Sequence, residues 1–183
     1  IHSPSQLGHG SNYHLFKHGI KPMWEHEANK RGGKWIIHIN RRYKDKLDTA
    51  WLYLSMALIG ENFKEGDEIC GGVVSVRKNG DRISLWTRSA RESEVCKHIG
   101  VQFRELLSMV IPEMKLVYQA HSDSLQNDSS FGNQPLYYLT HPANKDDSVV
   151  IATSPSTSSS ASMSLSSSMG SATGIGGSGV KVQ

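Results

Sequence analysis

Runs of apolar residues with two different periods divide much of the chain into predicted strands and helices. Five short runs rich in β-branched and aromatic residues are typical of strands, at residues 35–39, 70–77, 82–88, 115–121 and 136–140. In two longer segments apolar residues recur every three or four positions, which predicts helices over about 48–59 and about 92–109. The apolar stripe of the second helix comprises Val95, Ile99, Phe103, Leu106 and Val110.

Turn-forming residues indicate how these elements are connected. Asn79 and Gly80, in the segment KNGD, predict a tight hairpin because both tolerate the positive φ angles of such a turn. Asp45 or Asp48 is expected to cap the first helix, and Gly60 to end it. Since hairpins join some strands, the sequence predicts an α+β domain with a largely antiparallel sheet and helices packed on one face. The other face would be free to form a site.

The first helix carries two apolar stripes. One contains Trp51, Leu54 and Leu58, and the other contains Leu52, Met56 and Ile59. An ordinary surface helix has one apolar face. Either this helix is deeply buried, or it covers the core with one side and docks a partner with the other. The pattern alone leaves both interpretations open, although the flexible thioether of Met56 is typical of adaptable binding surfaces.

Composition separates the C-terminal part of the chain from the rest. Ser, Gly and Thr dominate from about Thr153, and such a segment cannot bury enough apolar surface to offset the entropy of ordering it. We therefore expect a folded domain over residues 1–145 and a disordered, low-complexity tail over residues 146–183. The net charge of +3 is small, so any anion site must be local. No apolar run approaches the roughly 20 residues of a membrane span.

The cysteines and histidines do not form a metal-binding pattern. Cys70 and Cys96 have no metal-type spacing, and two reduced cysteines are expected in a cytoplasmic or nuclear protein. The histidines match no zinc motif, and His121 is interpreted as a hydrogen-bonded residue at a strand end. The sequence also offers neither a metal-holding carboxylate cluster nor a nucleophile with its base. It therefore predicts no metal, no cofactor and no catalytic residue.

Trp24 and Glu25 stand side by side in a segment full of turn formers, between Pro22 and Gly33. A Trp in such a loop can fold back as a lid on the core. Alternatively, its ring can be held out to stack on a flat ligand, with the Glu25 carboxylate as a hydrogen-bond acceptor.

Several blocks in order carry a resemblance to a known family. The blocks are LFKHGIKPMWEHEANKRGGKW, WLYLSMALIGE, EICGGVVSVRKNGDRISLW, KHIG and YQAHSDS. Together they resemble the translation initiation factor 4E family, which binds the 5′ cap of messenger RNA, over about residues 13–138. In the first and third blocks the residues most resemble the 4E-homologous, or class II, branch of the family. The resemblance implies a curved sheet with helices on its convex face and the cap's 7-methylguanine stacked on Trp rings in its concave face.

The resemblance also implies a role for individual residues. The cap-binding positions of the family correspond to Trp24, Glu25, Trp86, Arg77 and Arg82. Methylation at N7 makes the purine cationic, so stacking on Trp gains a cation–π contribution of about 0.5–2 kcal/mol. An ionised Glu can accept from the adjacent N1–H and N2–H₂ donors of guanine, while the two Arg hold phosphates. The helix that docks factor 4G or an inhibitory competitor corresponds to Leu52, Met56, Ile59, Gly60 and Glu61.

The chain departs from the family pattern at several places. Family members have a strand, a helix segment, a sandwiching aromatic residue and a Trp before the part that begins near Tyr13, so we expect this chain to be a fragment. Each missing base–aromatic stack would cost roughly 1–3 kcal/mol of cap affinity. Asn79 replaces a phosphate contact, which leaves Lys78 to compensate, and residues 122–135 contain no Lys or Arg. Tyr53 replaces an acidic residue of the docking helix.

The sequence thus predicts a binding module rather than an enzyme. It would bind capped messenger RNA and a factor 4G-type or repressor protein, as a monomer within a heteromeric complex in the cytoplasm, or also in the nucleus. One alternative is a truncated adaptor that keeps partner docking but has little cap affinity. Another is an enzyme acting on a nucleotide, such as a cap hydrolase, for which the sequence offers no catalytic group.

Overall fold

One antiparallel sheet organises the chain. The computed structural model describes residues 2–127, 133–139 and 150–151. Within them the strand order is β1-β3-β4-β2-β5-β6-β7, and every neighbouring pair is antiparallel. The strands span Asn12–Phe16 (β1), Gly33–Ile39 (β2), Ile69–Ser75 (β3), Asp81–Thr87 (β4), Leu116–Ala120 (β5), Tyr137–Leu139 (β6) and Val150–Ile151 (β7).

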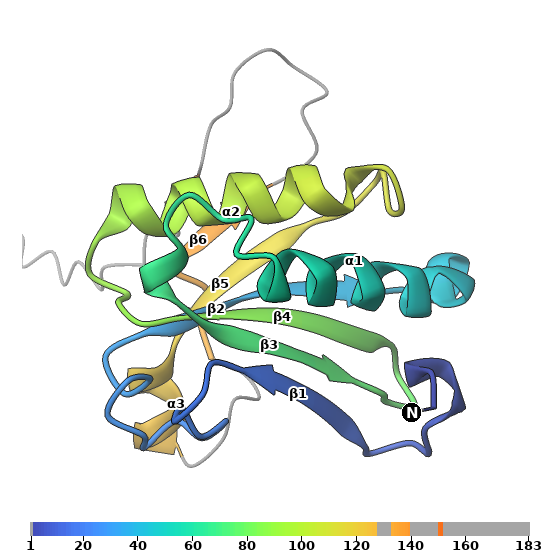
Figure 1. The fold of residues 1–183 in the computed structure, drawn as a ribbon, viewed down its shortest axis with the longest axis horizontal. Coiled ribbons are helices and arrows are strands. Elements are labelled where there is room, and N and C mark those ends of the chain that lie inside the picture. The colour runs from blue at the N-terminus through green and yellow to red at the C-terminus, as the bar shows by residue number, and fades with distance from the viewer. Residues whose placement is uncertain (1, 128–132, 140–149, 152–183) are drawn as a thin grey trace, which may run out of the picture. The chain divides into compact units, whose positions relative to one another are not determined.

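Two long helices share one face of this sheet. Figure 1 shows α1 (Leu47–Ile59) and α2 (Ser93–Ser108) side by side above the strands, with α3 (His121–Asn127) on the other side. Three short 3₁₀ helices complete the elements, at Pro4–Gln6 (η1), Arg41–Lys46 (η2) and Gly66–Glu68 (η3). The predicted α+β class, the antiparallel sheet and the helices on one face are confirmed. No helix of the described residues combines the length and apolar character needed to cross a membrane.

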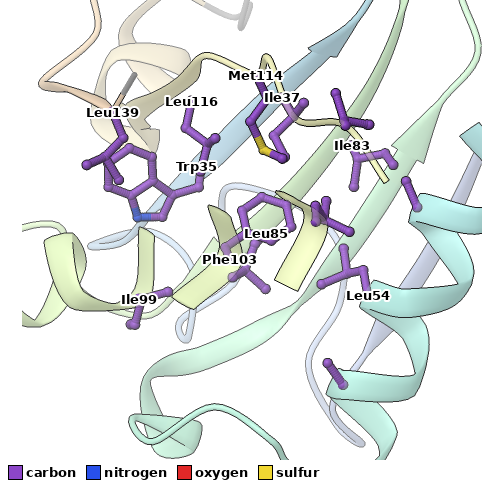
Figure 2. Packing of buried hydrophobic residues seen from close by; sticks show 14 of the residues in the cluster. Trp35, Ile37, Leu54, Ile83, Leu85, Ile99, Phe103, Met114, Leu116 and Leu139 are labelled. Atoms are coloured by element: carbon purple, nitrogen blue, oxygen red, sulfur yellow. The ribbon is translucent and has the colours of Figure 1, made fainter. Parts of the chain in front are cut away.

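The core lies between the sheet and these two helices. Alternation along β4 sends Ile83 and Leu85 into it, whereas Arg82, Ser84 and Trp86 point to the opposite face. Figure 2 shows Ile83, Leu85 and Trp35 packed with residues of both helices, including Leu54 and Phe103. The buried line of α2 runs through Cys96, Ile99, Phe103 and Leu107, so Leu107 rather than Leu106 is fully buried.

Glycine lets α2 approach the sheet closely. A Cβ at Gly100 would lie 2.5 Å from ring carbons of Trp35 and 2.7 Å from Leu139. The indole nitrogen of Trp35 donates to the carbonyl of Cys96 over 2.8 Å, one helical turn before Gly100. Trp35 is thus fully buried in the core.

Two predictions of local turn chemistry are wrong. Neither Asp45 nor Asp48 caps α1, because η2 leads into the helix with Lys46 already in helical geometry. Asp48 instead accepts hydrogen bonds from the backbone N–H and hydroxyl of Ser5. Asn79 does not have a positive φ; in the hairpin only Gly80 does, at 118°.

Besides the 3₁₀ helices and β7, two described elements have no counterpart among the predicted ones. Strand β1 lies at the sheet edge and pairs only with β3. Because it is short and partly exposed, its sequence shows little hydrophobic periodicity. Helix α3 has the polar sequence HSDSLQN, which carries no helical apolar stripe. Its first residue, His121, and its Ser124 are fully buried, so tertiary contacts rather than an apolar stripe hold it.

The end of the described chain bears on the expected tail. Strand β7 pairs with β6 through Val150 and Ile151, inside the range 146–183 for which the composition predicts disorder. The rest of that range lies outside the described residues, as do residues 140–145.

Candidate functional site

A cavity of about 410 Å³ lies on the sheet face opposite α1 and α2. Its floor is built from the outward-pointing residues of β2, β3 and β4, and one wall is the loop between β1 and β2. The lining comprises Asn12, His14, Pro22, Met23, Trp24, Glu25, Lys34, Ile36, Val73, Ser75, Arg77, Arg82, Ser84 and Trp86.

All five residues predicted to bind the cap line this one cavity. They come from the β1–β2 loop, from β4 and from the hairpin between β3 and β4. They are Trp24, Glu25, Trp86, Arg77 and Arg82. Side chains that are far apart in sequence therefore meet at one concave surface, which has two aromatic rings toward one end and two guanidinium groups toward the other.

The loop that carries Trp24 is held by a buried amide. Asn29 is fully buried, and its Nδ2 donates to the carbonyls of Lys21 and Met23, each over 2.8 Å. Trp24 itself is half-buried and packs against the small cluster of Cys70, Val73 and Trp86, while the next residue, Glu25, is exposed. The ring is thus fixed at the cavity wall by its loop and is not buried as a lid on the main core.

Trp86 forms the other aromatic surface and has little freedom to move. It is 6% exposed and lines the cavity, with its ring centroid 5.4 Å from that of Phe16 in an edge-on contact. The imidazole of His121 packs against it at 4.1 Å. Phe16 from β1 and His121 from α3 therefore support the ring from two sides.

The two guanidinium groups differ in how they are held. Nη1 of Arg77 donates to the carbonyls of Ser11 and Val76, at 3.1 and 2.9 Å, and Nη2 donates to Oδ1 of Asn12 at 2.8 Å. These bonds use only part of its donors and fix the plane of the group. In Arg82, the buried Nε has no hydrogen-bond partner among the described residues. A buried donor without a partner is costly, so Arg82 is suited to accept an anionic ligand.

Lys34 is a cavity residue that the sequence interpretation missed. It is buried to 8% exposure, and its Nζ lies 5.8 Å from the ring centroid of Trp86. Burial, and to a smaller extent the charge of Arg82, lowers the pKa of Lys34 to about 8. Strand alternation could have found it, because Lys34 and Ile36 share the face opposite to the core residue Trp35.

His121 differs from its interpretation as a hydrogen-bonded strand-end residue. Its backbone N–H does donate to Gly32, but both ring nitrogens are buried without a partner among the described residues. Burial, followed by the charge of Lys34, lowers the pKa of His121 to about 3, so the ring is neutral at physiological pH. Its role in the site is to support Trp86.

Two further observations concern chemistry at the site. Among the described residues no group of three His, Cys, Asp or Glu side chains could hold a metal. Both cysteines are buried free thiols, and burial raises the pKa of the Cys70 thiol to about 11. A thiol with so high a pKa is a poor nucleophile at neutral pH.

The second apolar stripe of α1 is exposed on the far side of the sheet. Leu52, Met56 and Ile59 are 54%, 61% and 74% exposed, whereas Leu54 on the first stripe is fully buried. The helix ends at Gly60, and Glu61 has a left-handed φ of 51°. The structure excludes deep burial of this helix, because one face covers the core and the other is exposed to solvent.

The comparisons with known proteins agree with this geometry. The family described as Eukaryotic initiation factor 4E matches residues 1–136. Eukaryotic translation initiation factor 4E from Dictyostelium discoideum is 43% identical over 133 residues, which cover 73% of this chain and 50% of that protein. The human factor 4E is 42% identical over 132 residues, covering 71% of this chain and 60% of that protein. The chain thus spans about half the length of the relatives it matches.

Solved structures give the same result. A complex of Caenorhabditis elegans factor 4E-3 with the 4E-binding protein Mextli and a cap analogue has a TM-score of 0.66 and 44% identity, covering 76% of this chain and 75% of that one. Ascaris suum factor 4E-3 with an m7G cap has a TM-score of 0.66 and 40% identity, covering 75% and 73%. The chain belongs to the eukaryotic initiation factor 4E family.

Proposed function

We propose that this protein binds the 7-methylguanosine cap of messenger RNA in the cavity between Trp24 and Arg82. The observation that carries the proposal is that five residues, chosen from sequence alone, line one cavity on the sheet face away from the helices. Two related proteins of the same fold were solved with a cap or a cap analogue, which supports the same ligand class here.

The cavity residues divide the ligand into a base end and a phosphate end. Trp24 packs against the cluster that contains Trp86, and both line the cavity, so a cationic purine can lie against an indole ring there and gain a cation–π contribution. Glu25 follows Trp24 and can accept the two adjacent donors on the guanine edge. Arg82 lies four residues before Trp86 on β4, roughly 13 Å along the strand at about 3.3 Å per residue. Arg77 and Arg82 are therefore suited to the phosphates that follow the nucleoside.

Lys34 adds a positive charge along this path. It lies on the same sheet face as Arg82 and Trp86, and Trp86 is its cross-strand partner. Glu25 is the single carboxylate that lines the cavity among the described residues, and it belongs to the base end. The charges of Glu25, Arg77 and Arg82 therefore match a ligand that is cationic at its base and anionic at its phosphates. We propose that the protein is a binding module rather than an enzyme and that it breaks no bond in the ligand. We also propose that it functions in the cytoplasm.

We further propose that the exposed stripe of α1 docks a peptide of factor 4G or of a repressor. The related factor 4E-3 was solved with a 4E-binding protein, which supports such a partner for this chain. A truncated adaptor that docks a partner with little cap affinity remains the alternative, and it differs from the first proposal in a single measurement, the affinity for a cap analogue.

Substitution of Glu25 tests the cap proposal. Glu25→Gln should weaken binding of 7-methyl-GTP by roughly 10- to 100-fold, because one neutral acceptor replaces two charge-assisted bonds. Affinities would be measured by Trp fluorescence quenching, with unmethylated GTP as the second ligand. The matched control is Glu27→Gln, since Glu27 is an exposed acid of the same loop that pairs with Lys30 outside the cavity. Equal losses in the two variants, or no binding by the unsubstituted protein, would refute cap binding at this site.

A further inference from the structure

A second cavity adjoins the first at the hairpin between β3 and β4. It also measures about 410 Å³, and it shares Arg77 and Arg82 with the first cavity. Its walls come from three places: the segment before β1, the end of β2 and the hairpin itself. The lining comprises His9, Gly10, His38, Arg77, Lys78, Asn79, Gly80 and Arg82.

The charge of this second cavity is of one sign. Two guanidinium groups, one lysine side chain and two imidazoles line it, and its described lining includes no carboxylate. The nearest acid in sequence, Asp81, is buried and its Oδ1 accepts the backbone N–H of Arg77 over 2.9 Å. That carboxylate closes the hairpin and is not presented to the cavity. The chemistry therefore suits an anionic ligand.

The two imidazoles add a different kind of recognition. His38 is the cross-strand partner of Arg82 on the same sheet face. The His38 side chain is exposed, but desolvation by its surroundings, followed by the charge of Arg82, lowers its pKa from the ordinary value, which favours the neutral ring at physiological pH. A neutral imidazole offers one hydrogen-bond donor and one acceptor, which fits a sugar hydroxyl better than a fully charged phosphate. A basic cavity with such a group is suited to a phosphate joined to a ribose.

The order of residues along β4 places this cavity after the triphosphate. Trp86 marks the base end, and Arg82 marks the point where the two cavities meet. Arg77 is fixed at the same point by its bonds to Ser11, Val76 and Asn12. The unpartnered Nε of Arg82 leaves a donor for a ligand oxygen at this junction. For a ligand that extends past the phosphates held there, the adjoining cavity offers a path toward the hairpin.

We propose that the second cavity binds the first nucleotide of the RNA chain, through its ribose and the phosphodiester that follows. His9 and His38 contact that nucleotide, and Arg77 and Arg82 bridge it to the cap. This inference rests on the proposed cap function and extends it from the isolated cap to capped RNA. It makes the site a reader of the RNA backbone as well as of the methylated base.

Three ligands distinguish this proposal from cap binding itself. They are 7-methyl-GTP, the dinucleotide in which the triphosphate joins 7-methylguanosine to guanosine, and a capped trinucleotide that adds one phosphodiester. The unsubstituted protein is expected to bind the trinucleotide roughly 3- to 10-fold more tightly than the dinucleotide, and this gain should shrink as salt rises because the trinucleotide carries one more phosphate charge. His38→Ala and His9→Ala should reduce or abolish this gain while 7-methyl-GTP affinity stays unchanged.

The matched control is His18→Ala, because His18 is an exposed histidine that lines neither cavity. It should retain the full gain. If the unsubstituted protein gains nothing from the added nucleotides, or if both cavity variants keep the gain, the second cavity does not read RNA while cap binding stands. If 7-methyl-GTP fails to bind, the cap function and this inference fall together.

Discussion

At the scale of single residues, the cavity depends on cations that are only partly hydrated. Lys34 is the clearest case, because it lines the cavity and is buried there. The charge of Arg82 adds to the effect of burial in lowering the pKa of Lys34. A pKa of about 8 means that Lys34 is charged below that pH and loses its charge as the pH rises through it. An anionic ligand stabilises the charged form, so binding and protonation are coupled.

This coupling predicts a pH dependence for ligand binding. Affinity for 7-methyl-GTP should fall roughly tenfold between pH 7 and pH 9, because the charge-assisted contact to Lys34 is lost over that window. Lys34→Arg should flatten the Lys34 part of the curve, since a guanidinium stays charged above pH 12. Both proteins would be titrated by fluorescence across this range.

Methylation at N7 also makes the N1–H of guanine more acidic, so part of the decline belongs to the ligand. That part is common to both proteins, and the difference between the two curves reports Lys34. Superimposable curves would show that Lys34 takes no part in binding.

At the scale of elements, glycines decide how closely the helices and strands approach one another. Gly100 brings α2 onto Trp35, and Gly33 brings β2 onto β5, where a Cβ would lie 2.5 Å from the carbonyl of Gln119. The pair Gly32-Gly33 therefore acts through close packing and not as a phosphate-binding loop. These contacts fix the β2 register, which in turn places Lys34 and His38 on the ligand face.

The packing of α2 predicts the effect of one added methyl group. Gly100→Ala should lower the free energy of unfolding by roughly 1–2 kcal/mol, because the new Cβ overlaps a ring that is fully buried and hydrogen-bonded. Alanine's higher helix propensity offsets up to about 1 kcal/mol of that cost. Urea denaturation would measure the difference. Gly8→Ala is the control, since a Cβ at Gly8 meets no atom within 4 Å; a variant of Gly100 as stable as this control would contradict the packing argument.

At the scale of the whole described domain, the sheet separates two surfaces. The ligand cavity lies on one face, and the exposed stripe of α1 lies beyond the core on the other. Met56 and Ile59 belong to the most exposed apolar residues of the described chain, together with Met109 at the end of α2. Because the core between the surfaces is closely packed, substitutions on one face are expected to leave the other intact.

Met56→Asp tests this separation. It should weaken binding of a factor 4G peptide by roughly 10- to 100-fold, because a charge replaces an apolar side chain that the partner would bury. Affinity for 7-methyl-GTP and the thermal midpoint should stay unchanged, since the residue is exposed. Met109→Asp places the same substitution on another exposed methionine and should change neither affinity. Calorimetric titration of both variants with both ligands would measure this, and a parallel loss for Met109→Asp would rule out a specific docking surface.

Elements with a periodic, local signal can be predicted from the amino-acid sequence. Strands β2 to β6, both long helices and the two stripes of α1 follow from spacing, because a buried face must repeat at the period of its element. The five predicted cap-binding residues of the cavity were identified from the resemblance of the sequence blocks to the factor 4E family. By contrast, β1, α3 and the caps of α1 depend on contacts with residues far away in sequence, such as Ser5 with Asp48 and His121 with Trp86.

Tertiary structure alone decided which charged groups meet and how strongly each is desolvated. Nothing in the run of residues around Lys34 shows that Arg82 and Trp86 lie beside it, because cross-strand neighbours are set by sheet register. The second cavity has the same origin, since His9, His38 and Lys78 come from separate segments that only folding brings together. Local spacing can specify an element, but burial and electrostatic coupling are properties of the assembled sheet.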